Sequence, residues 1–418
     1  MTLLSPEASL DDARTRFLRA VLRDNMREGP KNGHGRSLTL LEAAEIANLS
    51  RPSVQQFYQS LRDAGVALRD RVEIKDDAGY VLGVDLRDTH PVRVVLCNAH
   101  GMQQGEVWAP ATPADDEKTA DKGPTASALL DLAHEGIMAC AARERRSSAD
   151  LIGIGISLPG PVVDGFAVGS EASPWDLIRA DQGLERRLGP WLSGADPEII
   201  VTRSDAYASA VMEHLWGAPE AAAANTIYVK WSVDLRASII VNGELYTGHK
   251  GTAGELGHIQ TEAPPSVIPC LVCGHRQCLH AIASLQHLSE IAYPPRSGDE
   301  AAMSRFLVPA EDVVMRARED RRTLEALKVA AHWIGIAVAS YVAALDPATV
   351  VLGGAIGSRA FDLVQEDFKQ PIAERVPSNS PDIEIVGAEI SQHTATLGVA
   401  ACALLERGPA YLRKKMVS

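Results

Sequence analysis

Hydrophobic periodicity divides the chain into two parts of different kind. Before residue 80, apolar side chains recur every three or four positions, as Leu10, Phe17 and Val21 do within residues 9–27. This spacing is typical of amphipathic helices. After residue 80, short apolar runs alternate with long helical patterns, which is the signature of an α/β body. We therefore expect a helical module over residues 1–78 and an α/β domain over residues 79–418.

Local signals divide the helical module further. Thr39 and Glu42 have the spacing of a capping box, which predicts a short helix that begins after Thr39 and runs to Asn48. Ser50 has the features of an N-cap for a second helix over residues 51–64. Residues 66–77 could then form a hairpin wing. The order helix, turn, helix, hairpin predicts a winged helix-turn-helix that binds double-stranded DNA.

The second of these helices separates an apolar stripe from a polar face. Val54, Phe57 and Leu61 recur at helical spacing and are expected to be buried. In a helix-turn-helix the polar face of the second helix enters the major groove, where Gln can pair with adenine and Arg with guanine or phosphate. The alternative is a small helical packing or dimerisation module with a solvated polar face. The outward-facing candidates for DNA contact are Arg51, Ser53, Gln55, Gln56, Gln59 and Arg62.

The body shows strands and helices in alternation. This pattern predicts an α/β fold with two sheets, or two halves of a sheet, and a cleft between them. The strands are expected at residues 80–86, 92–96, 151–157, 198–202, 227–230 and 237–241. The long helices are expected at residues 124–145, 206–215 and 321–344.

Charge and hydropathy limit the possible partners. The net charge of −13 argues against a protein that coats nucleic acid by charge alone. Acidic and basic residues are equal in number within residues 1–80, so local docking of that module on DNA stays open. Residues 1–17 place acids where a signal peptide carries basic residues, and no window approaches eighteen uninterrupted apolar residues. We expect a cytoplasmic protein with no membrane partner.

A cluster of cysteines indicates a metal. Three of the six cysteines fall within nine positions, and His258 precedes them. Three thiolates and one imidazole are a complete tetrahedral ligand set for structural Zn²⁺, and a reducing compartment favours metal over disulfide. His275 and His280 are close enough in sequence to compete as ligands, and the alternative is three buried free thiols. The predicted ligands are His258, Cys270, Cys273 and Cys278, whereas Cys97, Cys140 and Cys402 read as core residues.

Several short segments, in order, resemble the ROK (repressor, open reading frame, kinase) family over residues 79–405. They are 83–85, 157–160, 204–206, 254–258, the cysteine cluster and 351–354. The resemblance implies an actin-like, ribonuclease-H-like body of two subdomains with a zinc-binding loop at residues 255–280. In kinase members of the family, ATP and a hexose meet in the cleft. The preceding helix-turn-helix suits the repressor branch.

The resemblance also implies roles for individual residues. Asp205 matches the family's catalytic base, while Glu255 and His258 match positions that contact the sugar. Ser204 and His280 stand where the family has asparagine and glutamate, which changes the hydroxyls that the pocket can satisfy. These five residues are the candidate contacts for a sugar or sugar-phosphate effector.

The two phosphate loops of the family are altered. The first reads Asp85-Leu86-Arg87-Asp88-Thr89, in which charged residues replace both glycines, and the second, residues 230–238, contains no glycine. Glycines let backbone N–H groups approach phosphates, and both loops lack them. We therefore expect no kinase activity, with Asp205 as a vestige of the catalytic base. The expected protein is a zinc-containing ROK repressor of carbohydrate metabolism, a homodimer or homotetramer because operator half-sites require at least two copies. Alternatives are an ATP-dependent sugar kinase with an appended helical module, and a regulator that binds another protein.

Overall fold

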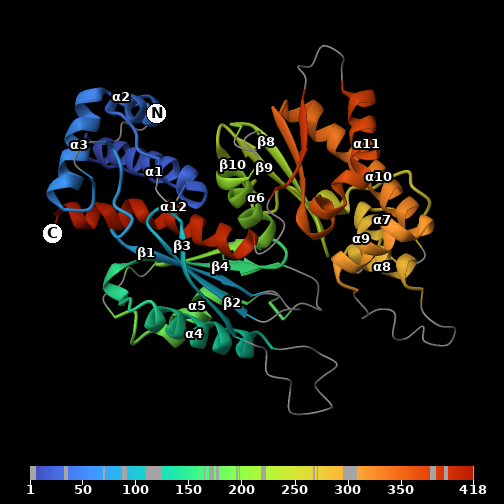
Figure 1. The fold of residues 1–418 in the computed structure, drawn as a ribbon, viewed down its shortest axis with the longest axis horizontal. Helices are drawn as coiled ribbons and strands as arrows, with labels where there is room; N and C mark the ends of the chain where they lie inside the picture. Colours follow the sequence, from blue (N-terminus) through green and yellow to red (C-terminus); the bar gives the residue numbers. More distant parts are fainter. Residues whose placement is uncertain are drawn as a thin grey trace. The chain divides into compact units, whose positions relative to one another are not determined.

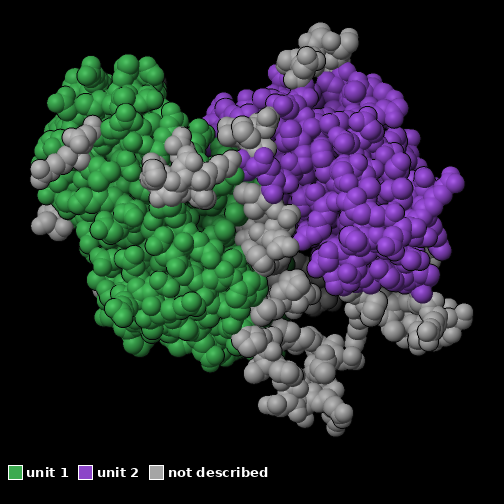
Figure 2. Space-filling view, in the orientation of Figure 1, with its two compact units in different colours: residues 1–216, 395–418 green, residues 217–394 purple. Residues whose placement is uncertain are grey.

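The computed structural model of the chain contains two compact units. Unit 1 comprises Met1–Trp216 and Ala395–Ser418, and unit 2 comprises Gly217–Thr394 (Figure 2). The chain therefore leaves unit 1, forms unit 2 and returns to unit 1 with its last helix. The structure describes residues 6–32, 36–68, 71–86, 92–109, 125–163, 165–168, 174–175, 178–193, 196, 198–217, 223–266, 269–270, 272–294, 308–376, 383–389 and 394–417.

Unit 1 begins with three helices (Figure 1): α1 (Pro6–Asn32), α2 (Leu40–Ala47) and α3 (Arg51–Asp63). The predicted capping box is present at the start of α2, where the Thr39 hydroxyl accepts from the Glu42 N–H at 3.2 Å and the Glu42 carboxylate accepts from the Thr39 N–H at 2.7 Å. Ser50 caps α3 by accepting from the Ser53 N–H at 3.3 Å. Both helices thus begin where these capping residues place them.

A hairpin follows α3. It is marked by the bridge Ala67↔Ile74, and its second arm pairs with the segment before α2 through Leu38↔Val72. The Tyr58 hydroxyl of α3 donates to the Leu68 carbonyl at 2.5 Å and so fastens the hairpin to the helix. The tip, residues 69–70, lies outside the described residues. Residues 36–77 are thus the part of the helical module that follows α1.

Helix α1 joins this module to the rest of unit 1. The Trp216 indole N–H donates to the Met26 carbonyl at 2.6 Å, and Asn25 Oδ1 accepts from the Ile74 N–H of the hairpin at 2.9 Å. Leu22 lies against Gly408 of the last helix, α12 (Thr394–Val417). One helix is therefore in contact with the hairpin and with two helices of the body.

The sheet of unit 1 has the order β3-β2-β1-β4-β7, in which β1–β3 are antiparallel neighbours and β1, β4 and β7 are parallel. Helices α4 and α5 cover one face, and α12 lies against the backbone of Gly83 and Gly155 on the other. A Cβ at either glycine would collide with a carbonyl of α12. The elements are β1 (Tyr80–Asp85), β2 (Val92–Asn98), β3 (Gln103–Ala109), α4 (Ala126–Arg143), β4 (Leu151–Leu158), the hairpin β5 (Val162–Val163) and β6 (Phe166–Ala167), α5 (Ala180–Leu188), β7 (Ile200–Ser204) and α6 (Asp205–Trp216).

Unit 2 contains a second sheet with the order β10-β9-β8-β11-β12. Strands β8, β9 and β10 are antiparallel, and Asn242 and Gly243, with φ of 54° and 75°, make a tight turn before β10. Helices α10 and α11 pack against each other beside this sheet. The elements are β8 (Thr226–Trp231), β9 (Leu235–Val241), β10 (Glu244–Tyr246), α7 (Leu279–Ala283), α8 (Leu285–Ala292), α9 (Ala310–Glu319), α10 (Arg321–Leu345), β11 (Thr349–Gly353), α11 (Gly354–Arg375) and β12 (Glu384–Gly387).

The predicted strands and long helices agree with the structure within a few residues. Strand β7 starts at Ile200 rather than 198, because Glu198 belongs to a turn in which its N–H donates to the Asp196 carboxylate at 2.9 Å. Among the described residues, α10 is long and apolar enough to cross a membrane by length and composition alone. Core helices of soluble proteins meet the same criterion, and half of the most apolar stretch of α10 is buried.

Candidate functional site

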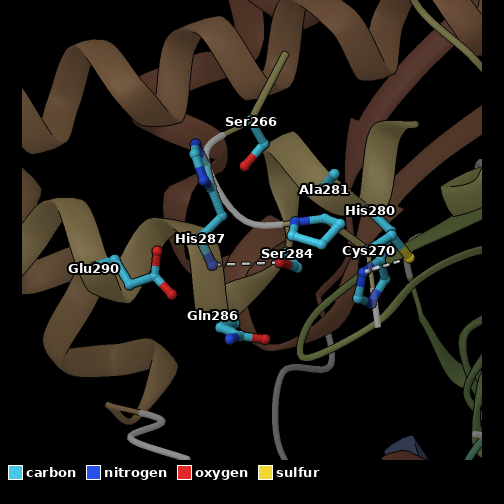
Figure 3. A pocket seen from close by; sticks show the side chains of 9 residues that line it. Ser266, Cys270, His280, Ala281, Ser284, Gln286, His287 and Glu290 are labelled. Carbon is cyan, nitrogen blue, oxygen red and sulfur yellow. Dashed lines mark hydrogen bonds between the residues drawn. The ribbon is translucent and has the colours of Figure 1, made fainter. Parts of the chain in front are cut away.

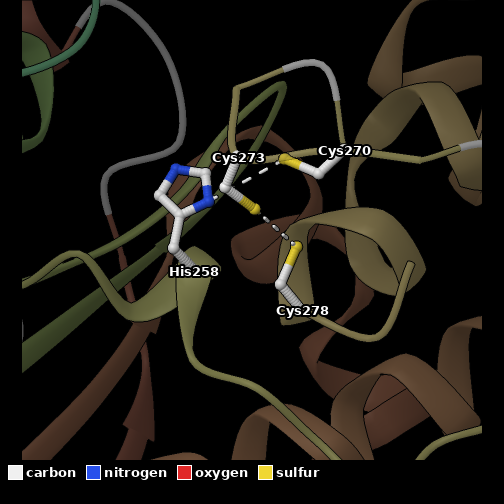
Figure 4. A group of neighbouring side chains, drawn as sticks. All are labelled: His258, Cys270, Cys273 and Cys278. Carbon is white, nitrogen blue, oxygen red and sulfur yellow. Dashed lines mark hydrogen bonds between the residues drawn. The ribbon is translucent and has the colours of Figure 1, made fainter. Parts of the chain in front are cut away.

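The four predicted metal ligands lie together in unit 2 (Figure 4). Their ligand atoms are all within 4.8 Å of one another. Cys273 Sγ lies 3.6 Å from Cys278 Sγ, and Cys270 Sγ lies 3.8 Å from His258 Nδ1. Tetrahedral zinc with Zn–S bonds of about 2.3 Å would hold sulfurs about 3.8 Å apart. The cluster therefore has the donors and the spacing to hold a metal ion.

Backbone hydrogen bonds shape the cysteine loop. The Gly274 N–H donates to the Cys270 carbonyl at 2.8 Å, and the Cys270 N–H donates to the His275 carbonyl at 2.9 Å. Gly274 has a φ of 72°, which a glycine adopts without strain. The bridge Gln260↔Cys278 then draws the segment after His258 alongside the third cysteine. The loop is thus folded by its own backbone into a geometry that suits a metal.

Of the two competing histidines, only His280 is near the cluster. His280 Nδ1 lies 3.7 Å from Cys270 Sγ, and its ring stacks on that of His258 with centroids 5.8 Å apart. The side chain of His275 is exposed and is not part of the group. Burial raises the pKa of the Cys270 thiol, but hydrogen bonds to His258 and His280 lower it to about 4. His280 can therefore orient the thiolate or serve as a ligand itself.

A small chamber adjoins the metal cluster (Figure 3). Its volume is about 10 Å³, enough for roughly one water molecule and far too small for a sugar. Three buried polar atoms, Ser266 Oγ, Gln286 Nε2 and Glu290 Oε1, have no hydrogen-bond partner among the described residues. Burial raises the pKa of Glu290 and lowers that of His287. The lining residues are Ser266, Pro269, Cys270, His280, Ala281, Ser284, Gln286, His287 and Glu290.

The predicted effector contacts Glu255 and His258 also lie beside the cluster. His258 Nε2 is 3.8 Å from Glu255 Oε2, while its Nδ1 faces Cys270. The other oxygen of Glu255 forms an ion pair with Arg236 of β9. Arg236 was not predicted from the sequence, because nothing in its local pattern indicates that it pairs with Glu255, nineteen residues away. Glu255 is therefore part of a charged network rather than an isolated carboxylate.

The other two effector candidates, Ser204 and Asp205, lie in unit 1. The Ser204 hydroxyl accepts from the Tyr207 N–H at 3.2 Å and caps α6, while Asp205 is buried as the first residue of that helix. Asp85, also buried, ends the parallel strand β1. Because β1, β4 and β7 are parallel, Asp85 at the end of β1 and Asp205 after the end of β7 share one edge of the sheet. The carboxyl ends of parallel strands are a common place for ligand sites. The predicted effector residues are thus divided between the two units.

The polar face of α3 lines a groove of about 560 Å³ in the helical module. Four of the six predicted DNA contacts line it: Arg51, Gln55, Gln59 and Arg62. Ser53 instead lies within 2.8 Å of the Ser50 hydroxyl at the helix cap, and Gln56 is exposed outside the groove. Arg71 of the hairpin and Leu41 of α2 also line it. Arg71 was not predicted from the sequence, where only the hairpin itself was indicated.

The structure describes the two altered phosphate loops, residues 85–89 and 230–238, to different extents. In the first loop, residues 87–89 lie outside the described residues. The second forms the turn between β8 and β9, which the Ser232 N–H closes by donating to the Asp234 carbonyl at 3.0 Å. Trp231, fully buried, fixes this turn to α7 because its indole N–H donates to the Ala283 carbonyl at 2.7 Å. Residues 231–235 thus form a hydrogen-bonded turn, anchored by Trp231 and made without glycine.

Comparisons with known proteins agree with this architecture. The sequence matches the ROK family over residues 114–406. It is 25% identical to the xylose repressor of Bacillus subtilis (strain 168), with 78% of this chain and 77% of that protein covered. It is 28% identical to a glucokinase of Halalkalibacterium halodurans, with 54% of this chain and 67% of the relative covered.

A solved structure shares the fold along nearly the whole chain. It is that of a ROK family transcriptional regulator, a homologue of the E. coli MLC protein, and its TM-score is 0.70 at 19% identity. The alignment covers 96% of this chain and 99% of that one. The shared fold is the mixed α/β body with two sheets and, because the alignment is nearly complete, most of the region before β1.

Proposed function

The chain belongs to the ROK family, and we propose that it acts as a DNA-binding transcriptional repressor rather than as a sugar kinase. The observation that carries this proposal is the polar stripe Arg51, Gln55, Gln59 and Arg62 on the second of two helices joined by a short turn. An exposed stripe of Arg and Gln on such a helix has the donors and acceptors that read base edges in a major groove. The relatives named as repressors support the same conclusion.

In the proposed complex, α3 enters the major groove as the recognition helix of a winged helix-turn-helix. The hairpin of residues 66–75 is the wing, and its Arg71 contacts the phosphate backbone beside the groove. Ser50 and Ser53 hold the start of α3, where its N-terminal residues approach the bases. Two copies of the chain bind two half-sites, as a homodimer or homotetramer.

The cysteine cluster holds a structural zinc in this proposal. His258, Cys270, Cys273 and Cys278 supply four protein donors, which leaves no open position for a substrate or water. When bound, zinc would supply a rigid cross-link and no chemical step. The chain's own contribution is to fix the loop that carries Glu255 and His258.

A sugar or sugar-derived effector is proposed to regulate DNA binding. Asp205 and Ser204 of unit 1 and Glu255, His258 and His280 of unit 2 are the candidate contacts. The name of the xylose repressor relative supports a sugar as the effector class. An effector that prefers one conformation shifts the population toward it, and thereby changes the affinity for the operator.

The second candidate function is an ATP-dependent sugar kinase, favoured by the glucokinase relative and by the buried Asp205. Against it stands the closed turn at residues 231–235, which offers no glycine backbone to a nucleotide phosphate. Incubation with ATP and a hexose panel is expected to give no sugar phosphate. Phosphorylation that Asp205→Asn abolishes would establish the kinase instead.

Selection of binding sites from genomic DNA tests the main proposal. We expect one enriched sequence with two related half-sites. The variant Gln55→Ala should weaken binding by about 10-fold or more and relax the preference at one position of each half-site, whereas Arg71→Ala should weaken binding to all sequences equally. Gln103→Ala, on β3 of unit 1, is the matched control and should bind as the wild type does. Recovery of no enriched sequence contradicts the proposal.

A further inference from the structure

Two kinds of residue line the groove beside α3. One kind is the polar stripe of that helix, and the other is an apolar set that includes Leu38, Leu41 and Val72. Leu38 and Val72 are buried, and their backbones bond each other in both directions, at 3.2 and 2.8 Å. Their main chains therefore have no hydrogen bond left to offer, and the apolar set presents a ligand with hydrocarbon surface.

Leu41 is the part of the apolar set that reaches furthest into solvent. Its side chain is 57% exposed, at the second position of α2, where the capping box of Thr39 and Glu42 fixes the start of the helix. An exposed leucine is ordinary by itself. This one, however, lines the same groove as the Arg and Gln side chains proposed to read DNA. Burying it against an apolar group of the ligand would therefore add to the affinity.

The charge of the groove indicates what occupies it. Arg51 and Arg62 of α3 and Arg71 of the hairpin line it, and none of the described lining residues is acidic. Arginine is well suited to pairing with phosphate, whereas a purely apolar ligand would desolvate these cations without a partner. The occupant should therefore carry both negative charge and an exposed apolar group.

We propose that Leu41 contacts the C5-methyl group of a thymine and makes thymine the preferred base at one position of each half-site. Of the groups that the four bases present in a major groove, this methyl is the apolar one. The inference rests on the proposed DNA binding by α3 and adds a contact from α2 to it. Gln55, which lines the same groove, can pair with an adenine edge. The two side chains together favour A·T pairs.

The test removes the methyl group and nothing else. Deoxyuridine replaces each thymine of one half-site of the selected operator, one position at a time, and fluorescence anisotropy measures the affinity. Uracil keeps the pairing of thymine but lacks its methyl. The wild type should bind about 4-fold more weakly at one position, as expected for one buried methyl group. Leu41→Ala should bind the thymine operator more weakly and no longer distinguish the two bases at that position.

Two further variants serve as controls. Ile46→Ala also removes an exposed aliphatic side chain of α2, 49% exposed but outside the groove lining, and should keep the 4-fold discrimination. Leu41→Met keeps an apolar side chain of similar size and should keep the discrimination too. Because position 41 is exposed, the melting temperature of Leu41→Ala should stay within about 2 °C of the wild type.

The possible outcomes separate this inference from the proposed function. An operator that the wild type binds equally well with deoxyuridine at every position contradicts the methyl contact alone. Full discrimination by Leu41→Ala does the same, because another residue then reads the methyl. If the groove holds a protein segment instead, Leu41→Ala binds the operator as the wild type does, and the inference is wrong. Recovery of no operator overturns DNA recognition and the methyl contact together.

Discussion

The helical module and the metal region of unit 2 are stabilised by contacts that differ in their reach along the chain. The metal region consists of residues 230–236, 254–258 and 270–283. In the helical module, the capping hydrogen bonds at Thr39 and Ser50 each join residues three positions apart. In the metal region, the Trp231 indole bonds a carbonyl 52 positions away. Each helix of the module can begin to form locally, whereas the metal region exists only after distant segments meet.

Because the contacts of the metal region join residues farther apart in the sequence, we expect this region to unfold more cooperatively than the helical module. Losing one cap in the helical module weakens one helix by a bounded amount, because its neighbours keep their own caps. Losing one contact in the metal region affects the cysteine loop, the β8–β9 turn and the Glu255 segment together, because each holds the other two in place. Four substitutions or conditions, ordered from the largest expected effect to the smallest, test this contrast.

The largest effect is expected for Cys278→Ser. The wild type should contain one zinc per chain, and the variant should lose it. The free energy of unfolding of unit 2 should then fall by over about 5 kcal/mol, because the binding energy of a structural zinc contributes directly to folding. Metal analysis and calorimetry measure the two effects. Cys402→Ala, a buried cysteine of unit 1, is the control and should retain the zinc. A full zinc content in Cys278→Ser contradicts the assignment of this ligand.

Trp231→Phe should have the next largest effect. It removes the indole donor and leaves the buried Ala283 carbonyl without its partner, at a cost of about 2 kcal/mol in the free energy of unfolding. Urea denaturation measures the loss. Trp108→Phe, at a position that is 43% exposed, should change stability by less than about 0.5 kcal/mol. Equal losses of stability in the two variants would contradict a role for the Trp231 hydrogen bond in holding the metal region.

Ser50→Ala tests a cap of the helical module. Loss of the hydroxyl that accepts from the Ser53 N–H should destabilise α3 by about 1 kcal/mol, while zinc content stays unchanged. Hydrogen exchange of the amides in α3 localises the effect. The Ser50→Asp variant, which keeps an acceptor at the cap, should restore wild-type protection. A loss of protection that extends into unit 2 would show that the module is not locally stabilised.

The smallest effect concerns pH. Hydrogen bonds from the backbone and side chain of Thr39 lower the pKa of Glu42 below its ordinary 4.5. A carboxyl whose pKa is depressed in the folded state stabilises above its unfolded pKa, and loses that contribution as pH falls through the folded pKa. Opening of α2, measured by hydrogen exchange, should therefore increase below about pH 4.5. Glu42→Gln should flatten this dependence, and an unchanged profile would contradict the role of the carboxylate.

The sequence predicted most of the helical module because its signals are local. Thr39, Glu42 and Ser50 each mark a helix start by chemistry that acts over three residues, and the structure shows those hydrogen bonds. The extent of α1 was less accessible. Residues 9–27 predicted a helix, but α1 runs from Pro6 to Asn32, and its contacts with Trp216 and Gly408 are ones that no local pattern reports.

In the metal region the ligand types were predictable and their surroundings were not. The spacing of Cys270, Cys273 and Cys278 specifies a chelating loop, and the structure brings His258 to it. The pairing of Arg236 with Glu255 depends on how Gly254 packs against β9, which is a tertiary contact. The missing glycines of residues 230–238 are visible in the sequence, but nothing in it indicates that Asp234 lies between two opposing cations, Lys230 and Arg236.

The return of α12 to unit 1 has a consequence for synthesis on the ribosome. Gly83 and Gly155 present bare backbone to this helix, and Leu22 of α1 packs against Gly408 within it. Residues 217–394 are translated before α12, so unit 1 lacks its last helix throughout the time in which unit 2 is made. During that interval one face of the first sheet and one side of α1 lack their cover. A nascent chain stalled before residue 395 should bind a holdase chaperone through this surface, and completion of α12 should release it.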